Sequence, residues 1–506
     1  MIDVLFINPN SSKYAYQALS DKYSAIETPT WSLLLAQSCR SKGFKVNILD
    51  CDAERLSNSK AIERIKLIKP KYTVFTVYGQ NPNSGTVNMS GAISLAKDLK
   101  DENVETKICF LGSHTSALPM EVLNLKFVDI VFTNEGVYAL HELLQINFNC
   151  LDSLKKVKGI GYKSEGKSIL NPPQKIVPQE KMDIDLPGYA WDLLPLKKKP
   201  LDLYRAHYWH TKFDDNTRTP FAAIYTSLGC KFSCNFCMIN ILNRESNNEN
   251  VDASNSKGMR FWSPSFISNE FLKLSKMGVT AIRISDEMFF LNKKYYNPLL
   301  KNIIDLDLKL NMWAYSRIDT VREDQLEIFK KAGVNWLALG IEAGNQTVRH
   351  EVSKGSFKDV NIRDICSKIK NYDINVISNY IFGLSEDNSD TINETLKLAI
   401  ELNTEMANMY PCQALPGSPM YNIAKNNNWS LPDSYEGYGF LSYDSQPLRS
   451  KHLSAKEILK FRDNAWNKYF TNPNYLKKIE IKFGITQRKN IEEMTKIKLK
   501  RKILGD

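Results

Sequence analysis

Short apolar runs alternate with helix-like stretches along residues 1–145. The apolar runs predict strands at Val4–Asn8, Lys45–Leu49, Tyr72–Tyr78, Lys107–Leu111 and Val128–Phe132. The stretches between them predict helices, for example over Trp31–Arg40, Lys60–Ile68 and Ser90–Leu99. Alternating units of this kind predict a doubly wound parallel sheet, whose ligands bind beyond the carboxyl ends of the strands.

Polar turns follow four of these predicted strands. They are Asn8-Pro9-Asn10, Tyr78-Gly79-Gln80, Gly112-Ser113-His114-Thr115 and Asn134-Glu135-Gly136. Because the carboxyl ends of parallel strands lie at one edge of a sheet, these turns are candidates for a ligand site.

The alternation fades between Cys150 and Pro220. A hairpin around Glu165-Gly166 and a stretch rich in proline and acidic residues predict a connector there. Strand–helix alternation then resumes, and six units predict a partial barrel. Its strands are expected at Ala222–Ser227, Ala281–Ser285, Met312–Ser316, Trp336–Gly340, Val376–Ile381 and Met406–Pro411. The predicted division is a sheet domain (1–148), a connector (149–219), a barrel (220–425) and a helical, finally basic region (426–506).

Composition is that of an ordinary globular chain, with 43% hydrophobic and 24% charged residues among 506. No apolar run approaches the ~20 residues that a membrane span needs, and no basic start or cleavage site precedes Val4, so we expect a cytoplasmic protein. Of the net charge of +11, +6 lies in residues 477–506. One interpretation of this tail is a solvated helical face, and the other is a surface that contacts nucleic acid or anionic lipid. Of these partners, we do not expect nucleic acid.

Three cysteines are closely spaced directly after the first barrel strand, as Cys230-x-x-x-Cys234-x-x-Cys237. Thiolates spaced this closely can hold one corner of an iron–sulfur cubane, and three ligands leave the fourth iron open for chemistry. Zinc is the alternative, but it would need a fourth ligand, and the nearest histidines are His210 and His350. The other six cysteines lie scattered, which excludes a disulfide framework.

This motif, with the aromatic Phe236 before its third cysteine, resembles the radical S-adenosylmethionine (SAM) superfamily. The resemblance implies a [4Fe-4S] cluster on Cys230, Cys234 and Cys237, whose open iron binds SAM and whose electron cleaves it to a 5′-deoxyadenosyl radical. It also implies an external electron donor such as a flavodoxin or ferredoxin. By position, Phe236 resembles the residue that packs near adenine.

Later strand ends resemble the SAM contacts of that superfamily. Asp286 and Glu287 are candidates for the SAM ammonium, although the common Gly-Gly-Glu form is absent. Ser316, Arg317 and Glu342 resemble contacts to ribose and the methionine carboxylate, since an Arg fork suits a carboxylate and a buried Glu suits an ammonium or hydroxyls. The bland alternative is a salt bridge between Arg317 and Glu342 at the barrel rim.

A doubly wound domain ahead of such a barrel resembles the cobalamin-binding radical SAM enzymes. The resemblance assigns cobalamin to the strand-end turns, and the candidate contacts are Asn8, Asn10, Tyr78, Gly79, Gly112, Ser113, His114, Asn134, Glu135 and Gly136. The cobalamin motif Asp-x-His-x-x-Gly is absent, so we expect no histidine ligand to cobalt and take His114 as a loop hydrogen-bonder.

The implied activity is methylation of an unactivated carbon of a biosynthetic small molecule, with one SAM supplying the methyl group to cobalamin and another the radical. Three alternatives stay open: oxidation, cyclisation or rearrangement with the same cofactors, tRNA methylthiolation, and non-catalytic cobalamin sensing. No catalytic acid or base is assigned. The aromatic-rich stretch Trp429–Trp466 is either helical core or a cover over the barrel mouth.

Overall fold

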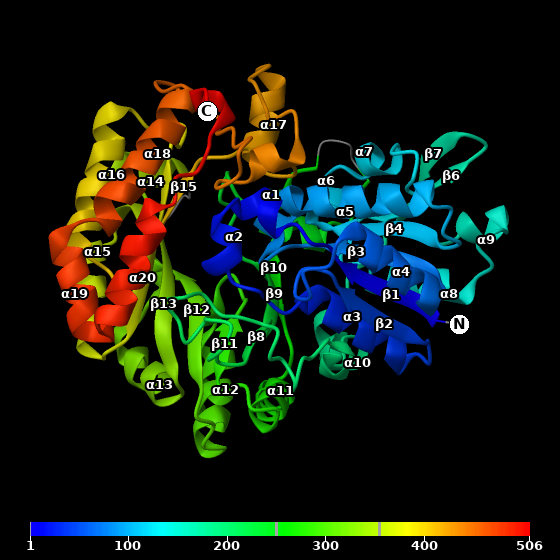
Figure 1. The fold of residues 1–506 in the computed structure, drawn as a ribbon, viewed down its shortest axis with the longest axis horizontal. Coiled ribbons are helices and arrows are strands. Elements are labelled where there is room, and N and C mark those ends of the chain that lie inside the picture. The colour runs from blue at the N-terminus through cyan, green and yellow to red at the C-terminus, as the bar shows by residue number, and fades with distance from the viewer. Residues whose placement is uncertain (1, 248–250, 353–355) are drawn as a thin grey trace.

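Two sheets lie side by side in the computed structural model, which describes residues 2–247, 251–352 and 356–506 (Figure 1). The first sheet has the order β2-β1-β3-β4-β5-β6-β7, and its first five strands are parallel. They are β1 (Ile2–Asn8), β2 (Val46–Asp50), β3 (Pro70–Val77), β4 (Lys107–Gly112) and β5 (Ile130–Phe132). The predicted doubly wound sheet is therefore confirmed, with its topological switch point between β1 and β3.

Both faces of this sheet are buried, but against different partners. Along β1, Val4 and Phe6 belong to a core shared with the barrel, whereas Leu5 and Ile7 pack on the other face. The outer face is covered by α4 (Asn58–Ile68) and α5 (Gly85–Asp101), and the inner side by α3 (Thr30–Ser41) and α8 (Val137–Gln145). The first sheet is thus fixed to the barrel through a continuous apolar core.

The predicted hairpin around Glu165-Gly166 forms the edge of the first sheet. Its strands β6 (Ile160–Ser164) and β7 (Lys167–Leu170) continue the sheet antiparallel from β5. Glu165 has φ 49° and Gly166 φ 75°, which is the left-handed conformation that a tight hairpin turn requires.

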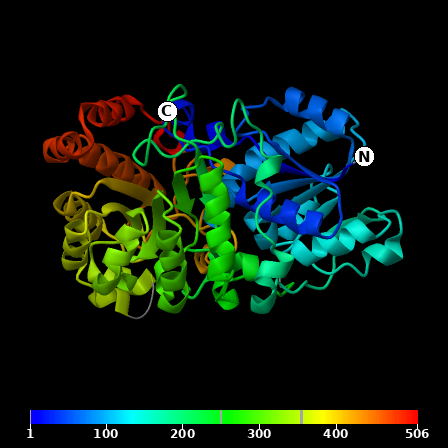
Figure 2. The ribbon, with the colours of Figure 1, turned by 90° about the horizontal axis from the view of Figure 1, so that it is seen from below.

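The second sheet has six parallel strands in the order β15-β14-β13-β12-β11-β8, as the predicted partial barrel requires. The strands are β8 (Phe221–Ile224), β11 (Ala281–Ile284), β12 (Asn311–Arg317), β13 (Val334–Glu342), β14 (Asn375–Phe382) and β15 (Met406–Pro411). Helices on the outside are α11 (Pro264–Lys276), α12 (Lys293–Asp305), α13 (Leu326–Lys331), α15 (Ile362–Asn371) and α16 (Ser389–Leu402). Helix α14 (Gln346–Val352) packs at the strand ends, in the apolar cluster that also contacts Phe236. Figure 2 shows the two sheets as separate halves of the molecule.

An antiparallel pair that the sequence did not predict stands between the halves. β9 (Ser227–Cys230) pairs with β10 (Gly258–Phe261), and Cys230 faces Gly258 in the register. The first cysteine of the motif therefore ends a strand rather than lying in an open loop.

The C-terminal region returns to the N-terminus. Helices α17 (Pro419–Asn426), α18 (Ala455–Phe470), α19 (Pro473–Phe483) and α20 (Ile485–Lys496) lie beside the barrel, and the chain then ends close to α1 (Ser12–Tyr16) (Figure 1). The side chain of Gln17 donates to the carbonyls of Leu441 and Lys500. Among the described residues, no helix combines the length and apolar character that crossing a membrane requires.

Part of the basic tail packs against the rest of the protein. Arg501 is 1% exposed, and its guanidinium bonds to Asp463 at 2.9 Å and to the carbonyl of Ser442 at 2.8 Å. Lys22 of the N-terminal domain bonds to Glu493 of α20 at 2.7 Å. These contacts join the tail to the fold, while Lys498 and Lys500 remain exposed.

Candidate functional site

The three motif cysteines line one cavity of about 1110 Å³. Gly229, at φ 84°, turns the chain just before Cys230, and a Cβ there would lie 2.3 Å from the carbonyl oxygen of Gly258. The backbone N–H of Cys230 donates to Asn240 Oδ1 at 2.9 Å, and the N–H of Cys237 donates to the carbonyl of Cys234 at 3.1 Å. These bonds hold the loop so that its thiols face the same space.

Thiol chemistry and spacing fit a cluster better than a single ion. Within the part of the chain that the structure describes, no three His, Cys, Asp or Glu side chains converge closely enough to hold one metal ion. Burial raises the pKa of Cys230 to about 12 and raises that of Cys237 as well. Thiolates in such surroundings need positive charge to be stable, which the irons of a cubane would supply. Cys230, Cys234 and Cys237 are the residues that would hold it.

Phe236 lines the cavity between the second and third cysteines. Its ring packs against an apolar cluster that includes Ala343, Leu384 and Cys412, at the ends of the barrel strands. Its place beside the thiols agrees with the adenine-packing position that the resemblance assigned to it, which stays a prediction.

The adjacent acids after β11 have different surroundings. Asp286 accepts from the backbone N–H of Thr226 at 2.5 Å and from the hydroxyls of Thr226 and Ser227, each at 2.6 Å, so it fixes the β8–β9 junction. It is not among the cavity-lining residues, whereas Glu287 is. Glu287 Oε1 is buried without a hydrogen-bond partner, and burial raises the pKa of Glu287 to about 8. Of these two acids Glu287 is the one that lines the cavity, and its contact with SAM stays a prediction.

Ser316 and Arg317 end β12 and also line the cavity. Arg317 forms a two-pronged ion pair with Asp319, with Nε–Oδ1 2.6 Å and Nη2–Oδ2 2.7 Å. Its guanidinium carbon lies 3.7 Å from the ring centroid of Phe232 in the cysteine loop. The rim salt bridge considered from the sequence, between Arg317 and Glu342, is therefore replaced by the pair with Asp319.

Glu342 ends β13 in an unusual backbone conformation. Its φ is 62°, and the pairing with β14 shifts register between Gly340 and Glu342. A bulge of this kind re-aims a side chain, and a non-glycine residue at positive φ is typical of functional sites. A Cβ at position 340 would lie 2.5 Å from Glu342 Oε1, so any larger residue there would move the Glu342 carboxyl group. Burial raises the pKa of Glu342 to about 7.

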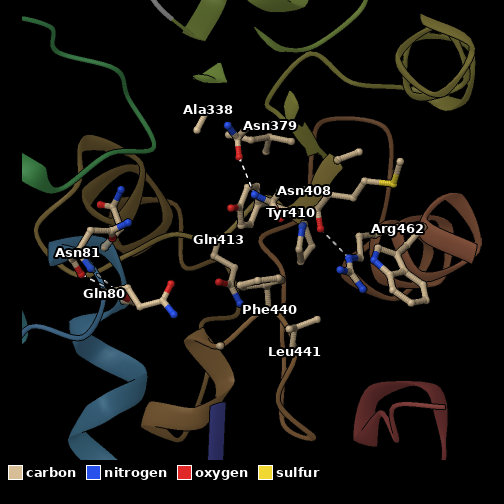
Figure 3. Close-up of a pocket in the computed structure, with 18 of the residues that line it drawn as sticks. Gln80, Asn81, Ala338, Asn379, Asn408, Tyr410, Gln413, Phe440, Leu441 and Arg462 are labelled. Atoms are coloured by element: carbon tan, nitrogen blue, oxygen red, sulfur yellow. Dashed lines mark hydrogen bonds between the residues drawn. The ribbon is translucent and has the colours of Figure 1, made fainter. Parts of the chain in front are cut away.

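Polar residues deeper in the barrel complete this wall. Asn408 Nδ2 donates to Asn379 Oδ1 at 2.9 Å, and Asn379 Nδ2 donates to the carbonyl of Leu339 at 3.1 Å. Figure 3 shows Asn379, Asn408 and Tyr410 on the barrel strands across the cavity from Gln80 and Asn81. The sequence predicts strands at all three positions, but none of the three was assigned to the site.

The turns after β1 and β3 carry four of the predicted cobalamin contacts, and none of the four lines the cavity. Asn8 donates to Asp50 at 2.7 Å, and Asn10 donates to the carbonyl of Leu56 at 3.3 Å. The ring of Tyr78 stacks on Trp31 with centroids 4.7 Å apart. Gly79, at φ 63°, forms the turn that leads into Gln80.

The turn after β4 likewise faces away from the cavity. Gly112 packs against the carbonyl of Val77, and the Ser113 hydroxyl donates to the carbonyl of Pro82 at 2.6 Å. His114, 1% exposed, lies 3.1 Å from Glu121 Oε1 and 3.2 Å from Thr86 Oγ1. These contacts give His114 the hydrogen-bonding role expected of it, and it is not among the residues that line the cavity.

The turn after β5 clamps the first sheet to the barrel side. Glu135, 1% exposed, pairs with Arg260 of β10 at 2.8 Å and accepts from the N–H of Val177 at 2.5 Å. Asn134 Nδ2 donates to the carbonyls of Gln174 and Arg244, and the N–H of Gly136 donates to Asn134 Oδ1. Asn134, Glu135 and Gly136 therefore hold two regions together in this structure, away from the cavity.

The N-terminal domain reaches the cavity through different residues. The loop after β3 contributes Gln80, Asn81, Asn83 and Ser84. Tyr16, the last residue of α1, and Leu19, the first residue of α2 (Leu19–Lys22), also line the cavity. Asn81 Oδ1 is buried without a partner and faces this space, so it fits a ligand with hydrogen-bond donors. The turn signal of Tyr78-Gly79-Gln80 pointed to this loop, but only its last residue lies in the site.

A buried ion pair forms the floor between the halves. Glu27, from the N-terminal domain, bonds to Arg283 in the middle of β11, and Arg283 is fully buried. The Arg283 guanidinium also lies 5.1 Å from the Trp313 centroid and bonds to the Tyr315 hydroxyl at 3.1 Å. His207 lies beside it, and burial lowers the His207 pKa to about 3, so that this histidine is neutral. His207, Trp313 and Tyr315 line the cavity, so aromatic rings border it next to this ion pair.

The C-terminal region covers the remaining side of the cavity. Tyr438, Phe440 and Trp466, from the aromatic-rich stretch, line it together with Leu499 from the tail. Arg462 Nε donates to the carbonyl of Met409 and stands beside Phe440 and Leu441 in Figure 3. These aromatic residues therefore cover the barrel mouth, which is the second of the two alternatives that the sequence left open for the stretch Trp429–Trp466.

Comparison with known proteins gives matches over the barrel and over the whole chain. Residues 224–399 match the model of the radical SAM superfamily, a range that includes the three cysteines, Glu287, Arg317 and Glu342. An uncharacterized methyltransferase of Pyrococcus horikoshii is 25% identical over 88% of this chain and 89% of its own length. Anaerobic magnesium-protoporphyrin IX monomethyl ester cyclase of Rubrivivax gelatinosus is 23% identical over 94% of this chain and 78% of its own.

Among solved structures, the fold is similar to that of the radical SAM methyltransferase TsrM from Kitasatospora setae. That structure contains cobalamin and a [4Fe-4S] cluster; it is 15% identical, covers 98% of this chain and 99% of its own, and has a TM-score of 0.65. The match extends across both sheets and the helical C-terminal region. With the family match, it confirms the resemblance drawn from the cysteine motif and the predicted order of sheet domain, barrel and helical end.

Proposed function

We propose that this chain, a member of the radical SAM superfamily, is a cobalamin-dependent enzyme that methylates an unactivated carbon of a biosynthetic small molecule. The observation that carries the proposal is the single cavity on which both sheets converge. Its volume of about 1110 Å³ exceeds the ~300–1,000 Å³ of a pocket for one drug-sized ligand. It therefore has room for a nucleoside cofactor together with a second molecule.

The residues present fit SAM and a cluster on the barrel side. Cluster and SAM together would supply a carbon radical, and cobalamin would supply a transferable methyl group. Glu287 has an unpartnered oxygen suited to an ammonium, and Arg317, oriented by Asp319, presents a planar cation suited to a carboxylate. Ser316 and Glu342 present a hydroxyl and a carboxyl that suit ribose hydroxyls.

Cobalamin would occupy the side formed by the N-terminal domain. Gln80, Asn81 and Ser84 line the cavity there. His207 lines the cavity, whereas His114 of the strand-end turn does not, so we expect no imidazole ligand to cobalt from His114. The chain's own part is then to orient the cofactors and to keep water and oxygen from a radical.

The direct test is anaerobic purification with cobalamin supplied, followed by metal and product analysis. We expect about four irons and one cobalt per chain, 5′-deoxyadenosine from SAM, and S-adenosylhomocysteine formed together with a methylated product. A reducing partner such as a flavodoxin or ferredoxin should replace a chemical reductant. Iron without cobalt would remove the cobalamin part of the proposal, and protein that yields no 5′-deoxyadenosine would remove all of it.

A second candidate keeps both cofactors without methyl transfer. The similarity to a magnesium-protoporphyrin ester cyclase over most of the chain favours ring formation or oxidation as that alternative. The two are separated by their products: 5′-deoxyadenosine without S-adenosylhomocysteine supports the cyclase-like reaction. Equal amounts of the two SAM products support methylation.

A further inference from the structure

The N-terminal domain makes a direct contact with a cysteine of the motif. Asn83, in the loop after β3, places its Nδ2 3.6 Å from Cys237 Sγ. The same side chain accepts the backbone N–H of Met238 through Oδ1 at 3.0 Å. These two contacts cross from one sheet domain to the cysteine loop of the other.

The second contact fixes which end of the amide faces the sulfur. With Oδ1 occupied by the Met238 N–H, the NH₂ group is the end that points to Cys237. A protonated thiol is also within 3.9 Å of Oδ1. A metal-bound thiolate has no proton to donate, so with a cluster bound only the N–H···S contact remains.

The loop that holds Asn83 is itself braced. Asn83 lies in a 3₁₀ turn, η1 (Pro82–Ser84), whose first carbonyl accepts from the Ser113 hydroxyl at 2.6 Å. The N–H of Asn81 donates to Ser84 Oγ at 3.3 Å, and the N–H of Ser84 donates to the carbonyl of Asn81 at 3.0 Å. Asn88 Nδ2 donates to the carbonyl of Ser84 at 2.9 Å. The N–H donor is therefore held in place by the N-terminal domain and does not depend on the cysteine loop alone.

We propose that Asn83 is a positioning residue that raises the reduction potential of the cluster by hydrogen-bonding to Cys237. A donor to a ligand sulfur stabilises the extra negative charge of the reduced cluster, and such outer contacts tune iron–sulfur potentials. The N-terminal domain then sets how easily the barrel cluster takes up its electron. This inference rests on the cluster part of the proposed function and is independent of methyl transfer.

The test compares cluster midpoint potentials of the full-length, cofactor-loaded protein by redox titration with EPR detection. Asn83→Leu removes the donor. Asn83→Asp also removes it, keeps an acceptor for the Met238 N–H, and adds a negative charge next to the sulfur. At the wild-type midpoint we expect the reduced-to-oxidised ratio to fall about threefold in Asn83→Leu. In Asn83→Asp we expect this ratio to fall about tenfold, which corresponds to a midpoint potential about 59 mV lower for a one-electron couple.

Asn88→Ala is the matched control, because it loosens the same loop without touching a cysteine. Its midpoint should shift less than that of either Asn83 variant, because the donor itself is kept. Unchanged midpoints in both Asn83 variants, or an equal shift in Asn88→Ala, would overturn the proposal. If Asn83→Leu loses iron, the midpoint of Asn83→Asp tests the proposal instead. If both Asn83 variants lose iron while Asn88→Ala keeps a full cluster, Asn83 is needed to hold the cluster, and the proposal that it tunes the reduction potential is wrong. A wild-type protein without any cluster would instead refute the proposed function.

Discussion

The two parallel sheets end at the same cavity but contribute to it differently. In the barrel, the strand-end residues predicted from sequence line the cavity almost without exception: Glu287, Ser316, Arg317 and Glu342 do, and Asp286 braces its neighbour. In the N-terminal sheet, the ten predicted strand-end residues bond elsewhere, and the next residues along one loop line the cavity instead.

The difference has a physical cause. The barrel strands end at the cavity, and Glu287, Ser316, Arg317 and Glu342 line it even where, as in Arg317, the side chain also has a partner in the protein. The N-terminal strand ends abut other parts of the chain, and their polar groups are used to satisfy buried partners, as Glu135 does with Arg260. A polar turn beyond a parallel strand therefore indicates a ligand site only where its polar groups are not already hydrogen-bonded to another part of the protein.

The largest effect is expected from removing a thiol on the barrel side. Cys234→Ala should lower the iron content well below four per chain and reduce 5′-deoxyadenosine formation at least ~100-fold, because an outer contact alone is worth ~10–100-fold at metal sites. Cys412→Ser is the control, since Cys412 lines the same cavity outside the motif. Full iron in Cys234→Ala would contradict the cluster assignment.

A predicted cobalamin contact that clamps the domains should act on stability instead. Glu135→Gln breaks a buried pair and leaves Arg260 uncompensated, which should lower the free energy of unfolding by about 3–5 kcal/mol in urea titrations. Glu327→Gln, in an exposed pair with Lys331, should cause no measurable change. If Glu135→Gln left stability intact but removed cobalamin, the comparison between the two sheets would be wrong.

Glu287→Gln should weaken SAM binding about 10- to 100-fold, because a hydrogen bond to a charged group contributes ~1.5–3 kcal/mol. Isothermal titration on cluster-loaded protein gives the dissociation constant. Asp286→Asn is the informative partner variant: it should lower stability through the lost contacts to Thr226 and Ser227. A larger loss of SAM affinity in folded Asp286→Asn than in Glu287→Gln would reverse the two assignments.

The same glutamate predicts a pH dependence of stability for the protein without SAM. Burial raises the Glu287 pKa from 4.5 to about 8, so between these values the folded protein holds a proton that the unfolded chain has released. The free energy of unfolding should therefore fall as pH rises through this window, on the order of 1–3 kcal/mol in total. Glu287→Gln should flatten that part of the profile; an unchanged slope would show that Glu287 is not the group responsible.

The smallest expected effect is on cobalt content and distinguishes two residues of the N-terminal domain, Gln80 and Asn10. Gln80→Ala should lower the cobalt content of protein purified with cobalamin about three- to tenfold through the loss of a neutral hydrogen bond. Asn10→Ala, whose side chain bonds to Leu56, should leave the cobalt content unchanged. The opposite ranking would restore the strand-end turn as the cofactor contact.

Most of the fold could be predicted because apolar runs and their spacing are local signals. All eleven parallel strands expected from the sequence are present in the described chain, and the hairpin at Glu165-Gly166 was marked by its turn. The β9–β10 pair escaped because its residues, from Ser227 and from Gly258, are short polar-to-apolar segments with no periodicity.

The sequence could predict only those site residues whose positions depend on the strand that they follow. The cysteine triad and Glu287 follow single strands, so the sequence located them. Which of Asp286 and Glu287 faces the cavity depends on the Thr226–Ser227 backbone, which lies in another strand. The contact of Asn83 with Cys237 joins residues 154 positions apart, and no local pattern announces it.

The central claim is that both domains present their cofactors to one cavity. EPR on anaerobic protein carrying a reduced cluster and cob(II)alamin tests it most directly, because two unpaired spins in one cavity interact magnetically. We expect the signals of iron and cobalt to broaden or split relative to protein loaded with either cofactor alone. Two signals that add without any interaction would contradict the shared cavity.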